Sequence, residues 1–138
     1  MEETRILVVD DEQEIADLLE LYLISDGYQV IKSGDALEGL AIMEREKIDL
    51  VLLDIMMPKM DGLEMCRKIR EKHNVPIIMV SAKTQELDKI VGLTTGADDY
   101  VTKPFNSELM ARVKSQLRRY RDLNPANERK GLRIARSV

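Results

Sequence analysis

Short apolar runs alternate with amphipathic stretches along most of the chain. Each run spans four or five residues and is bounded by polar or turn-forming residues, a pattern typical of buried β-strands. The runs cover residues 5–9, 28–32, 49–53, 76–80 and 99–102. The run at 28–32 is the most polar and predicts an edge strand, whereas 49–53 is the most apolar and predicts the central strand.

Apolar residues recur at intervals of three and four in the segments that follow the strands, which predicts a helix after each one. The first helix ends at Asp26–Gly27, and the second covers about 35–46. The third begins after a capping Asp61 and ends at His73–Asn74, the fourth begins at about Gln85 and ends at Gly96, and the fifth covers about 107–121. The apolar positions are, helix by helix, Ile15, Leu18, Leu19, Tyr22 and Leu23 in the first; Leu37, Leu40, Ala41 and Met43 in the second; Leu63, Cys66 and Ile69 in the third; Leu87, Ile90 and Val91 in the fourth; and Leu109, Val113 and Leu117 in the fifth. The four residues of the second helix are expected to face the core.

Strict alternation of strand and helix indicates an α/β fold with a parallel sheet and helices on both faces. Right-handed crossovers leave few topologies, and five such units predict a flavodoxin-like, doubly wound, five-stranded sheet of order 2-1-3-4-5 with five helices. Beyond residue 121 the pattern stops, and Pro, Asn and Gly occur among many charges. We therefore expect one domain over 1–121 and a linker or disordered tail over 122–138.

Composition narrows the class of protein. The chain has 138 residues, of which 44% are hydrophobic, enough for one ordinary core. No apolar run approaches the ~20 residues of a membrane span, and the acidic N-terminus is unlike a signal peptide. The single Cys66 cannot form an internal disulfide, which favours a cytoplasmic location. Basic residues gather late in the chain, but without interleaved aromatic residues they indicate a solvated or partner-facing helix rather than direct contact with nucleic acid.

Polar residues follow four of the five strands. Asp10 and Asp11 come after the first strand, Asp54 after the third, Ser81 after the fourth and Lys103 after the fifth. Taken singly, either early aspartate could cap the first helix, Lys103 could be an ion-pair partner of Asp54, and Ser81 could form a turn. Because the carboxyl ends of parallel strands meet at one edge, however, we expect all these side chains to converge on a site.

Three carboxylates at one sheet edge should either bind protons or hold a metal ion. Two of them about 4 Å apart repel by roughly 4 kcal/mol at an effective dielectric near 20. Oxygen ligands without His or Cys favour Mg²⁺, or Mn²⁺, over Zn²⁺, and such an ion commonly takes a phosphate oxygen as a further ligand. Lys103 and Ser81 would then face that phosphate, and the small Ala82 would leave room for it. Asp54, on the central strand, is the candidate nucleophile toward a phosphoryl group.

Four sequence blocks carry a family resemblance: VVDDE, LLDIMMPKMDG, VSAKT and GADDYVTKPF. In this order they resemble the CheY-like receiver domain of two-component response regulators. GADDYVTKPF followed by ELMARVKSQLRR is similar to the OmpR/PhoB subfamily and, within it, to VanR-type regulators. The resemblance implies that Asp54 accepts a phosphoryl group from a phosphohistidine on a sensor histidine kinase. It also implies that Mg²⁺ is held by Asp11, Asp54 and the backbone carbonyl of Met56, with Asp10 acting through water.

The resemblance implies a switch as well. Ser81 and Lys103 would contact the phosphoryl group, and Tyr100 would turn inward when Ser81 moves toward it. The Lys103–Pro104 peptide would be cis. The phosphorylated chain would form a homodimer through its fourth helix, fifth strand and fifth helix. The expected pairs between the two copies are Lys89 with Glu108, Asp99 with Arg112, and Asp98 with Lys114, with Arg119 nearby.

The resemblance to this subfamily also implies that the protein regulates transcription and binds DNA only through a C-terminal winged-helix domain. That domain is absent here, and we expect that the chain was cut in the linker rather than being naturally short. Two other functions remain open. A Mg²⁺-dependent phosphohydrolase would carry an acid two residues after its nucleophile, where this chain has Met56. A stand-alone receiver would act by docking to a protein partner. Apart from self-phosphorylation and slow autodephosphorylation, we expect no enzyme activity.

Overall fold

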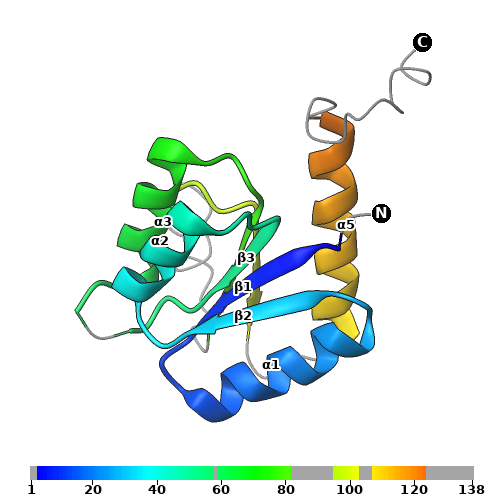
Figure 1. Cartoon of the computed structure of the whole chain (residues 1–138), viewed down its shortest axis with the longest axis horizontal. Helices are drawn as coiled ribbons and strands as arrows, with labels where there is room; N and C mark the ends of the chain where they lie inside the picture. Colours follow the sequence, from blue (N-terminus) through cyan, green and yellow to red (C-terminus); the bar gives the residue numbers. More distant parts are fainter. Residues whose placement is uncertain (1–2, 58, 82–94, 103–106, 124–138) are drawn as a thin grey trace.

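The computed structural model describes residues 3–57, 59–81, 95–102 and 107–123. Five parallel strands form one sheet in the order β2-β1-β3-β4-β5 (Figure 1). Their bounds are β1 Arg5–Val9, β2 Gln29–Ser33, β3 Leu50–Leu53, β4 Ile77–Ser81 and β5 Asp99–Thr102. The predicted strand order is confirmed, with the polar β2 at an edge and the apolar β3 in the centre.

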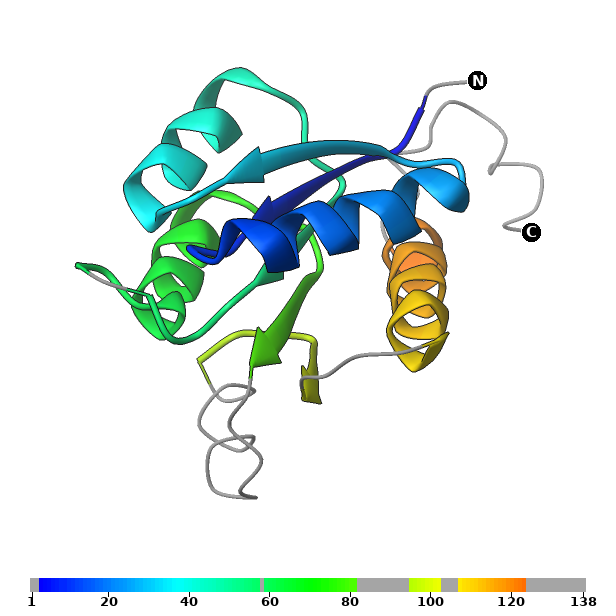
Figure 2. The same cartoon turned by 90° about the horizontal axis from the view of Figure 1, so that it is seen from below.

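Helices cover both faces of the sheet, as Figures 1 and 2 show. Their bounds are α1 Gln13–Ser25, α2 Ala36–Arg45, α3 Gly62–Lys72 and α5 Ser107–Leu123. α1 and α5 pack on one face, and α2 and α3 on the other. The helix expected from about Gln85 lies in 82–94, outside the described residues. None of the helices described here is long and apolar enough to cross a membrane.

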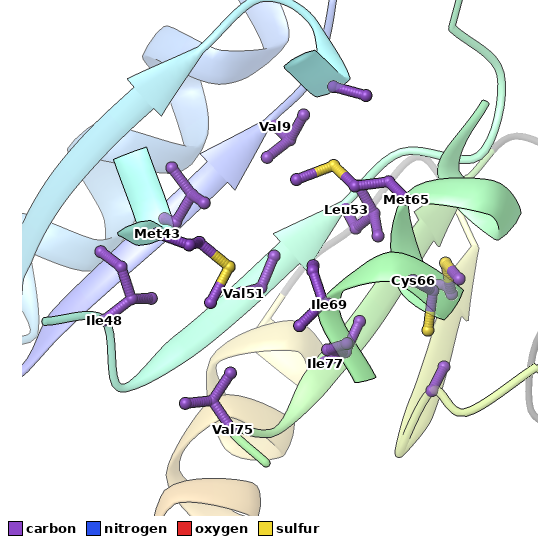
Figure 3. Close-up of a cluster of buried hydrophobic side chains, with 14 of the residues drawn as sticks. Val9, Met43, Ile48, Val51, Leu53, Met65, Cys66, Ile69, Val75 and Ile77 are labelled. Atoms are coloured by element: carbon purple, nitrogen blue, oxygen red, sulfur yellow. The ribbon is translucent and has the colours of Figure 1, made fainter. Parts of the chain in front are cut away.

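Side chains of each strand alternate between two cores. Ile6 and Val8 of β1 face α1 and α5, whereas Leu7 and Val9 face α2 and α3. Figure 3 shows the second core, where α3 residues pack over β3 and β4. Fully burying one such side chain stabilises the fold by about 1.5–3 kcal/mol. The strands are therefore held firmly, and so are the residues that follow their carboxyl ends.

The predicted inner face of α2 is wrong at two positions. Leu37 is 59% exposed and Ala41 is exposed, whereas the helix buries Ala36, Gly39, Ile42 and Met43. Two sets of residues have helical spacing here, so the pattern alone cannot choose between them. The helix buries the set that contains Ala36 and Gly39, because these two small residues let α2 approach β1 closely. Likewise in α1, Leu18 and Tyr22 are each 39% exposed, whereas Ala16, Leu19 and Leu23 are buried.

Cys66 of α3 is fully buried in the second core, and burial raises the pKa of its thiol. A thiol reagent can reach it only after local opening of the fold. We expect the native chain to react with a chromogenic disulfide reagent at least about a hundredfold more slowly than the chain in denaturant. Absorbance after mixing measures both rates, and equal rates would contradict the burial.

Candidate functional site

Asp10 and Asp54 lie side by side because they follow two paired strands. Val9 at the end of β1 is opposite Leu53 at the end of β3. The Asp54 N–H donates to the Val9 carbonyl at 3.0 Å, and the Asp10 N–H donates to the Ser33 carbonyl at 3.1 Å. The sheet thus fixes the backbone of both aspartates at the edge where the sequence predicted a site.

Three carboxylates meet at this edge. One oxygen from each of Asp10, Asp11 and Asp54 lies within 4.8 Å of the others. Asp10 and Asp54 are only 3% and 4% exposed, whereas Asp11 is exposed. Oxygens that share an octahedral Mg²⁺ at about 2.1 Å lie about 3–4.2 Å apart, so small side-chain movements suffice to hold one ion. The predicted acidic cluster is confirmed, and its residues fit a divalent cation of the Mg²⁺ or Mn²⁺ type.

Backbone N–H groups orient two of these carboxylates. Asp10 Oδ1 accepts a hydrogen bond from the Glu12 N–H at 2.9 Å, and Asp54 Oδ1 accepts one from the Met56 N–H at 3.3 Å. The residue that caps α1 is Glu12, and it makes no side-chain capping bond. Neither Asp10 nor Asp11 is therefore the N-cap of the first helix, which removes the simplest structural explanation for that acidic pair.

The loop after Asp54 folds back over the end of β3. The Gly62 and Met57 N–H groups both donate to the Ile55 carbonyl, at 2.9 and 3.1 Å. Asp61 caps α3 as predicted by accepting from the Glu64 N–H at 3.0 Å. α3 thereby begins directly on the backbone of Asp54.

Gly62 marks how close that approach is. A Cβ added there would lie 2.3 Å from the Asp54 carbonyl oxygen and 2.8 Å from the Ile55 Cα, distances at which backbone must move. Sequence reasoning did not single out Gly62. The sequence does contain one signal for it: a glycine at the first position of a helix can mark a place where two backbone segments approach so closely that a side chain does not fit. Met56, by contrast, is 57% exposed beside Asp54.

The other predicted site residues lie partly within the described chain. Ser81 ends β4 opposite Thr102 of β5, and Ser81 is fully buried. Tyr100, the predicted switch aromatic, is 6% exposed and belongs to the core under α3, so it is already inward in this structure. Lys103 and Pro104 lie outside the described residues, so the phosphoryl-contacting role and the cis peptide remain predictions.

Four of the seven residues predicted for a dimer face have partners within the chain. Asp99 pairs with Arg112, and Arg112 Nη2 also lies 2.7 Å from Glu108 Oε2. Asp98 pairs with Arg70 at 2.6 Å. Lys114 and Arg119 are exposed on α5, and Lys89 lies outside the described residues. The pairs expected between two copies therefore remain predictions. Arg70 was missed, because no sequence periodicity links a helix residue to a turn so far along the chain.

Comparison with known proteins identifies the family. Residues 6–114 match the response regulator receiver domain. The chain is 56% identical to regulatory protein VanR of Enterococcus faecium over 90% of this chain and 54% of that protein, and 51% identical to regulatory protein VanRc of Enterococcus gallinarum over 87% and 52%. The chain thus spans about half the length of these curated relatives.

Solved structures agree with this assignment. The receiver domain of the Francisella response regulator 1452 has a TM-score of 0.81 at 33% identity, covering 86% of this chain and 99% of that one. The activated receiver domain of Klebsiella pneumoniae RstA has a TM-score of 0.80 at 34% identity, covering 83% and 99%. The resemblance to VanR-type regulators of the OmpR/PhoB subfamily is confirmed. With its β2-β1-β3-β4-β5 sheet and its acidic edge, the chain belongs to the receiver-domain family of two-component response regulators.

Proposed function

We propose that Asp54 is the phosphoacceptor of a two-component signalling switch and that a sensor histidine kinase is its donor. One observation carries the proposal: three carboxylates meet at the carboxyl edge of the sheet, and the one on the central strand is buried and fixed by its neighbours. A buried carboxylate whose backbone N–H is bonded to the neighbouring strand and whose Oδ1 accepts from the Met56 N–H is well placed to attack a phosphorus atom.

In the transfer, a carboxylate oxygen of Asp54 attacks the phosphorus of a phosphohistidine. The P–N bond breaks, its electron pair stays on the histidine nitrogen, and an acyl phosphate forms on Asp54. Asp11, Asp54 and the Met56 carbonyl would hold a Mg²⁺ or Mn²⁺, with Asp10 acting through water, and the ion would supply positive charge that offsets the charge of the phosphoryl group. Ser81 and Lys103 complete the proposed phosphoryl contacts. In this role the chain promotes the transfer of a phosphoryl group from a phosphodonor to its own Asp54 and later loses it by slow autodephosphorylation, and we expect no other enzyme activity.

Phosphorylation adds about 1.5–2 negative charges and three acceptor oxygens at Asp54. We propose that this draws Ser81 toward the phosphoryl group, holds Tyr100 in its inward position and favours a homodimer through the face of β5, α5 and the fourth helix. A DNA-binding output would reside in a further C-terminal domain, since the chain spans about half of its curated relatives. Docking to a protein partner without DNA remains the alternative output.

Mass spectrometry of the intact protein tests the phosphoacceptor. Incubated with acetyl phosphate and Mg²⁺, the wild type is expected to gain one phosphoryl group, and chelation of the metal is expected to prevent the gain. Asp54→Asn is expected to gain none, because an amide cannot form the acyl phosphate. Glu71→Gln, which removes an exposed carboxylate elsewhere on α3, is the control and should behave as the wild type.

Unchanged labelling of Asp54→Asn would refute the assignment of Asp54. A phosphomonoester assay addresses the remaining enzyme function: rapid turnover of small substrates would favour a phosphohydrolase over a switch. The exposed thioether of Met56 beside Asp54 offers no acid for that reaction, so we expect turnover no faster than slow autodephosphorylation.

A further inference from the structure

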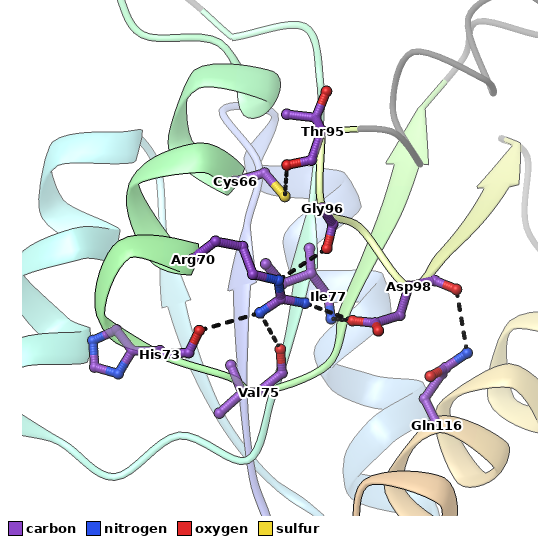
Figure 4. Close-up of polar contacts among 9 residues, drawn as sticks. All are labelled: Cys66, Arg70, His73, Val75, Ile77, Thr95, Gly96, Asp98 and Gln116. Carbon is purple, nitrogen blue, oxygen red and sulfur yellow. Dashed lines mark hydrogen bonds and ion pairs between the residues drawn. The ribbon is translucent and has the colours of Figure 1, made fainter.

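Arg70 connects the end of α3 to the turn that precedes β5 (Figure 4). Its Nη2 lies 2.6 Å from Asp98 Oδ2, its Nε donates to the Gly96 carbonyl at 3.0 Å, and its Nη1 donates to the Val75 carbonyl at 2.7 Å. A further, longer contact joins Nη1 to the His73 carbonyl at 3.4 Å. One planar guanidinium thus holds the starts of β4 and β5 together, which a single-point ammonium could not do.

Asp98 is held by its backbone as well as by its carboxylate. Its N–H donates to the Ile77 carbonyl at 2.8 Å, and Gln116 Nε2 of α5 donates to its carbonyl at 3.4 Å. The Ile77 N–H donates to Asp98 Oδ2 at 2.8 Å, so Arg70 and Ile77 use the same carboxylate oxygen. The side chain therefore has one orientation, in which Oδ1 takes neither of these two contacts. The Asp98 side chain is still 33% exposed, so an outside cation can approach it.

This pinned carboxylate lies far from the phosphoacceptor in the fold. Asp98 precedes β5, whereas Asp54 follows the carboxyl end of β3. The strands are parallel, so Asp98 lies at the amino ends of the strands and Asp54 at their carboxyl ends. A change at Arg70 can therefore alter Asp98 without touching the groups that would accept the phosphoryl group. Asp98 does border α5, where the exposed Lys114 lies.

We propose that Arg70 is a positioning residue for the dimer: it holds Asp98 through Oδ2 so that Oδ1 is presented to Lys114 of a second copy. The inference rests on the proposed dimer, and it gives a role in dimerisation to Arg70, which lies on α3 and outside the contact face of the dimer. An ion pair between two copies normally requires both side chains to become ordered, which weakens association. Asp98 is ordered before the copies meet, and a symmetric dimer contains this arrangement twice.

Light scattering over a concentration series tests the role, using full chains with beryllofluoride and Mg²⁺ as the phosphoryl mimic. Wild type is expected to dimerise, and Arg70→Met to dimerise roughly tenfold more weakly because Asp98 must be ordered on association at both symmetric positions. Arg67→Met is the matched control, since Arg67 lies on the same helix and pairs only with Glu64 among the contacts described. It should dimerise as the wild type, and all three should accept a phosphoryl group from acetyl phosphate equally.

Cys66 supplies an independent readout of the same turn. Its Sγ lies 3.9 Å from the Thr95 carbonyl, next to the Gly96 carbonyl that Arg70 holds. Arg70→Met is therefore expected to raise the rate at which a thiol reagent modifies Cys66, whereas Arg67→Met is not.

Should Arg70→Met fail to fold, Arg70→Lys keeps the charge opposite Asp98 but loses the forked contact with the carbonyls, and we expect its dimer to be several-fold weaker than that of the wild type.

The outcomes separate this inference from the proposed function. A wild type that remains monomeric would overturn the dimer itself. A wild type that dimerises while Arg70→Met dimerises equally well would overturn the role of Arg70 alone. Tighter dimerisation of Arg70→Met would also overturn it, because Arg70 would then compete with the second copy for Asp98.

Discussion

Asp54→Asn is expected to be more stable than the wild type when no divalent cation is present. The three carboxylate oxygens at the site lie within 4.8 Å of one another, and two charges at that separation repel by roughly 3 kcal/mol at an effective dielectric near 20. The substitution removes one charge, while the amide oxygen of the new side chain can still accept from the Met56 N–H. Because Asp11 is exposed and partly screened, we expect a net gain in the free energy of unfolding on the order of 1–3 kcal/mol.

Urea unfolding followed by circular dichroism, with a chelator and then with Mg²⁺, measures this effect. The wild type should gain stability as Mg²⁺ binds the folded state, whereas Asp54→Asn should gain little. Glu71→Gln should stay within about 0.5 kcal/mol of the wild type in either condition. A variant that is no more stable with the chelator, or that responds fully to Mg²⁺, would show that the cluster is not a strained cation site.

Gly62→Ala is expected to have the second large effect, on stability and on phosphoryl acceptance together. The new Cβ would meet the Asp54 carbonyl oxygen and the Ile55 Cα, neither of which can move away as a side chain does. Overpacking costs about 1–3 kcal/mol, and we expect a value near the upper end because backbone must shift. The shift displaces Asp54 from its two acidic neighbours, so labelling by acetyl phosphate should slow at least about tenfold.

Gly39→Ala provides the matched control. Its Cβ would approach the Met65 Cε at 2.8 Å and the Val9 Cγ2 at 3.2 Å, both of them ends of side chains. The flexible end of Met65 can move and the stiffer Val9 must give by a few tenths of an ångström, while alanine in the middle of a helix gains about 1 kcal/mol over glycine. We therefore expect a smaller net loss of stability than in Gly62→Ala. Urea unfolding and the labelling rate should therefore separate the two variants, and an equal loss in both would refute the special role of Gly62.

The strands were predictable because each apolar run has only one arrangement that buries it. Every strand bound agrees with its predicted run to within one residue. The inner face of α2 was not predictable, since Leu37 and Ala41 have the same spacing as the residues that the sheet buries. Choosing between them depends on how closely α2 approaches β1, and that distance is a property of the packed molecule.

The acidic cluster could be predicted from topology, because three aspartates follow two strands that the fold makes neighbours. The ion pairs could not. Sequence shows that Asp99 and Arg112 have opposite charges, but not whether they pair within one chain, as they do here, or between copies. The contact of Arg70 with Asp98 depends on where the turn before β5 passes the end of α3, for which no local pattern exists.

The pairing of β1 with β3 also has a consequence for folding kinetics. Asp10 precedes α1 and Asp54 follows β3, so α1, β2 and α2 all lie between them in the chain. The cation site exists only after this long loop has closed, a non-local step of the kind that makes folding slow. A bound cation therefore stabilises only states in which β1 and β3 are already paired. Whether Mg²⁺ speeds folding or only slows unfolding reports whether that pairing has formed in the transition state.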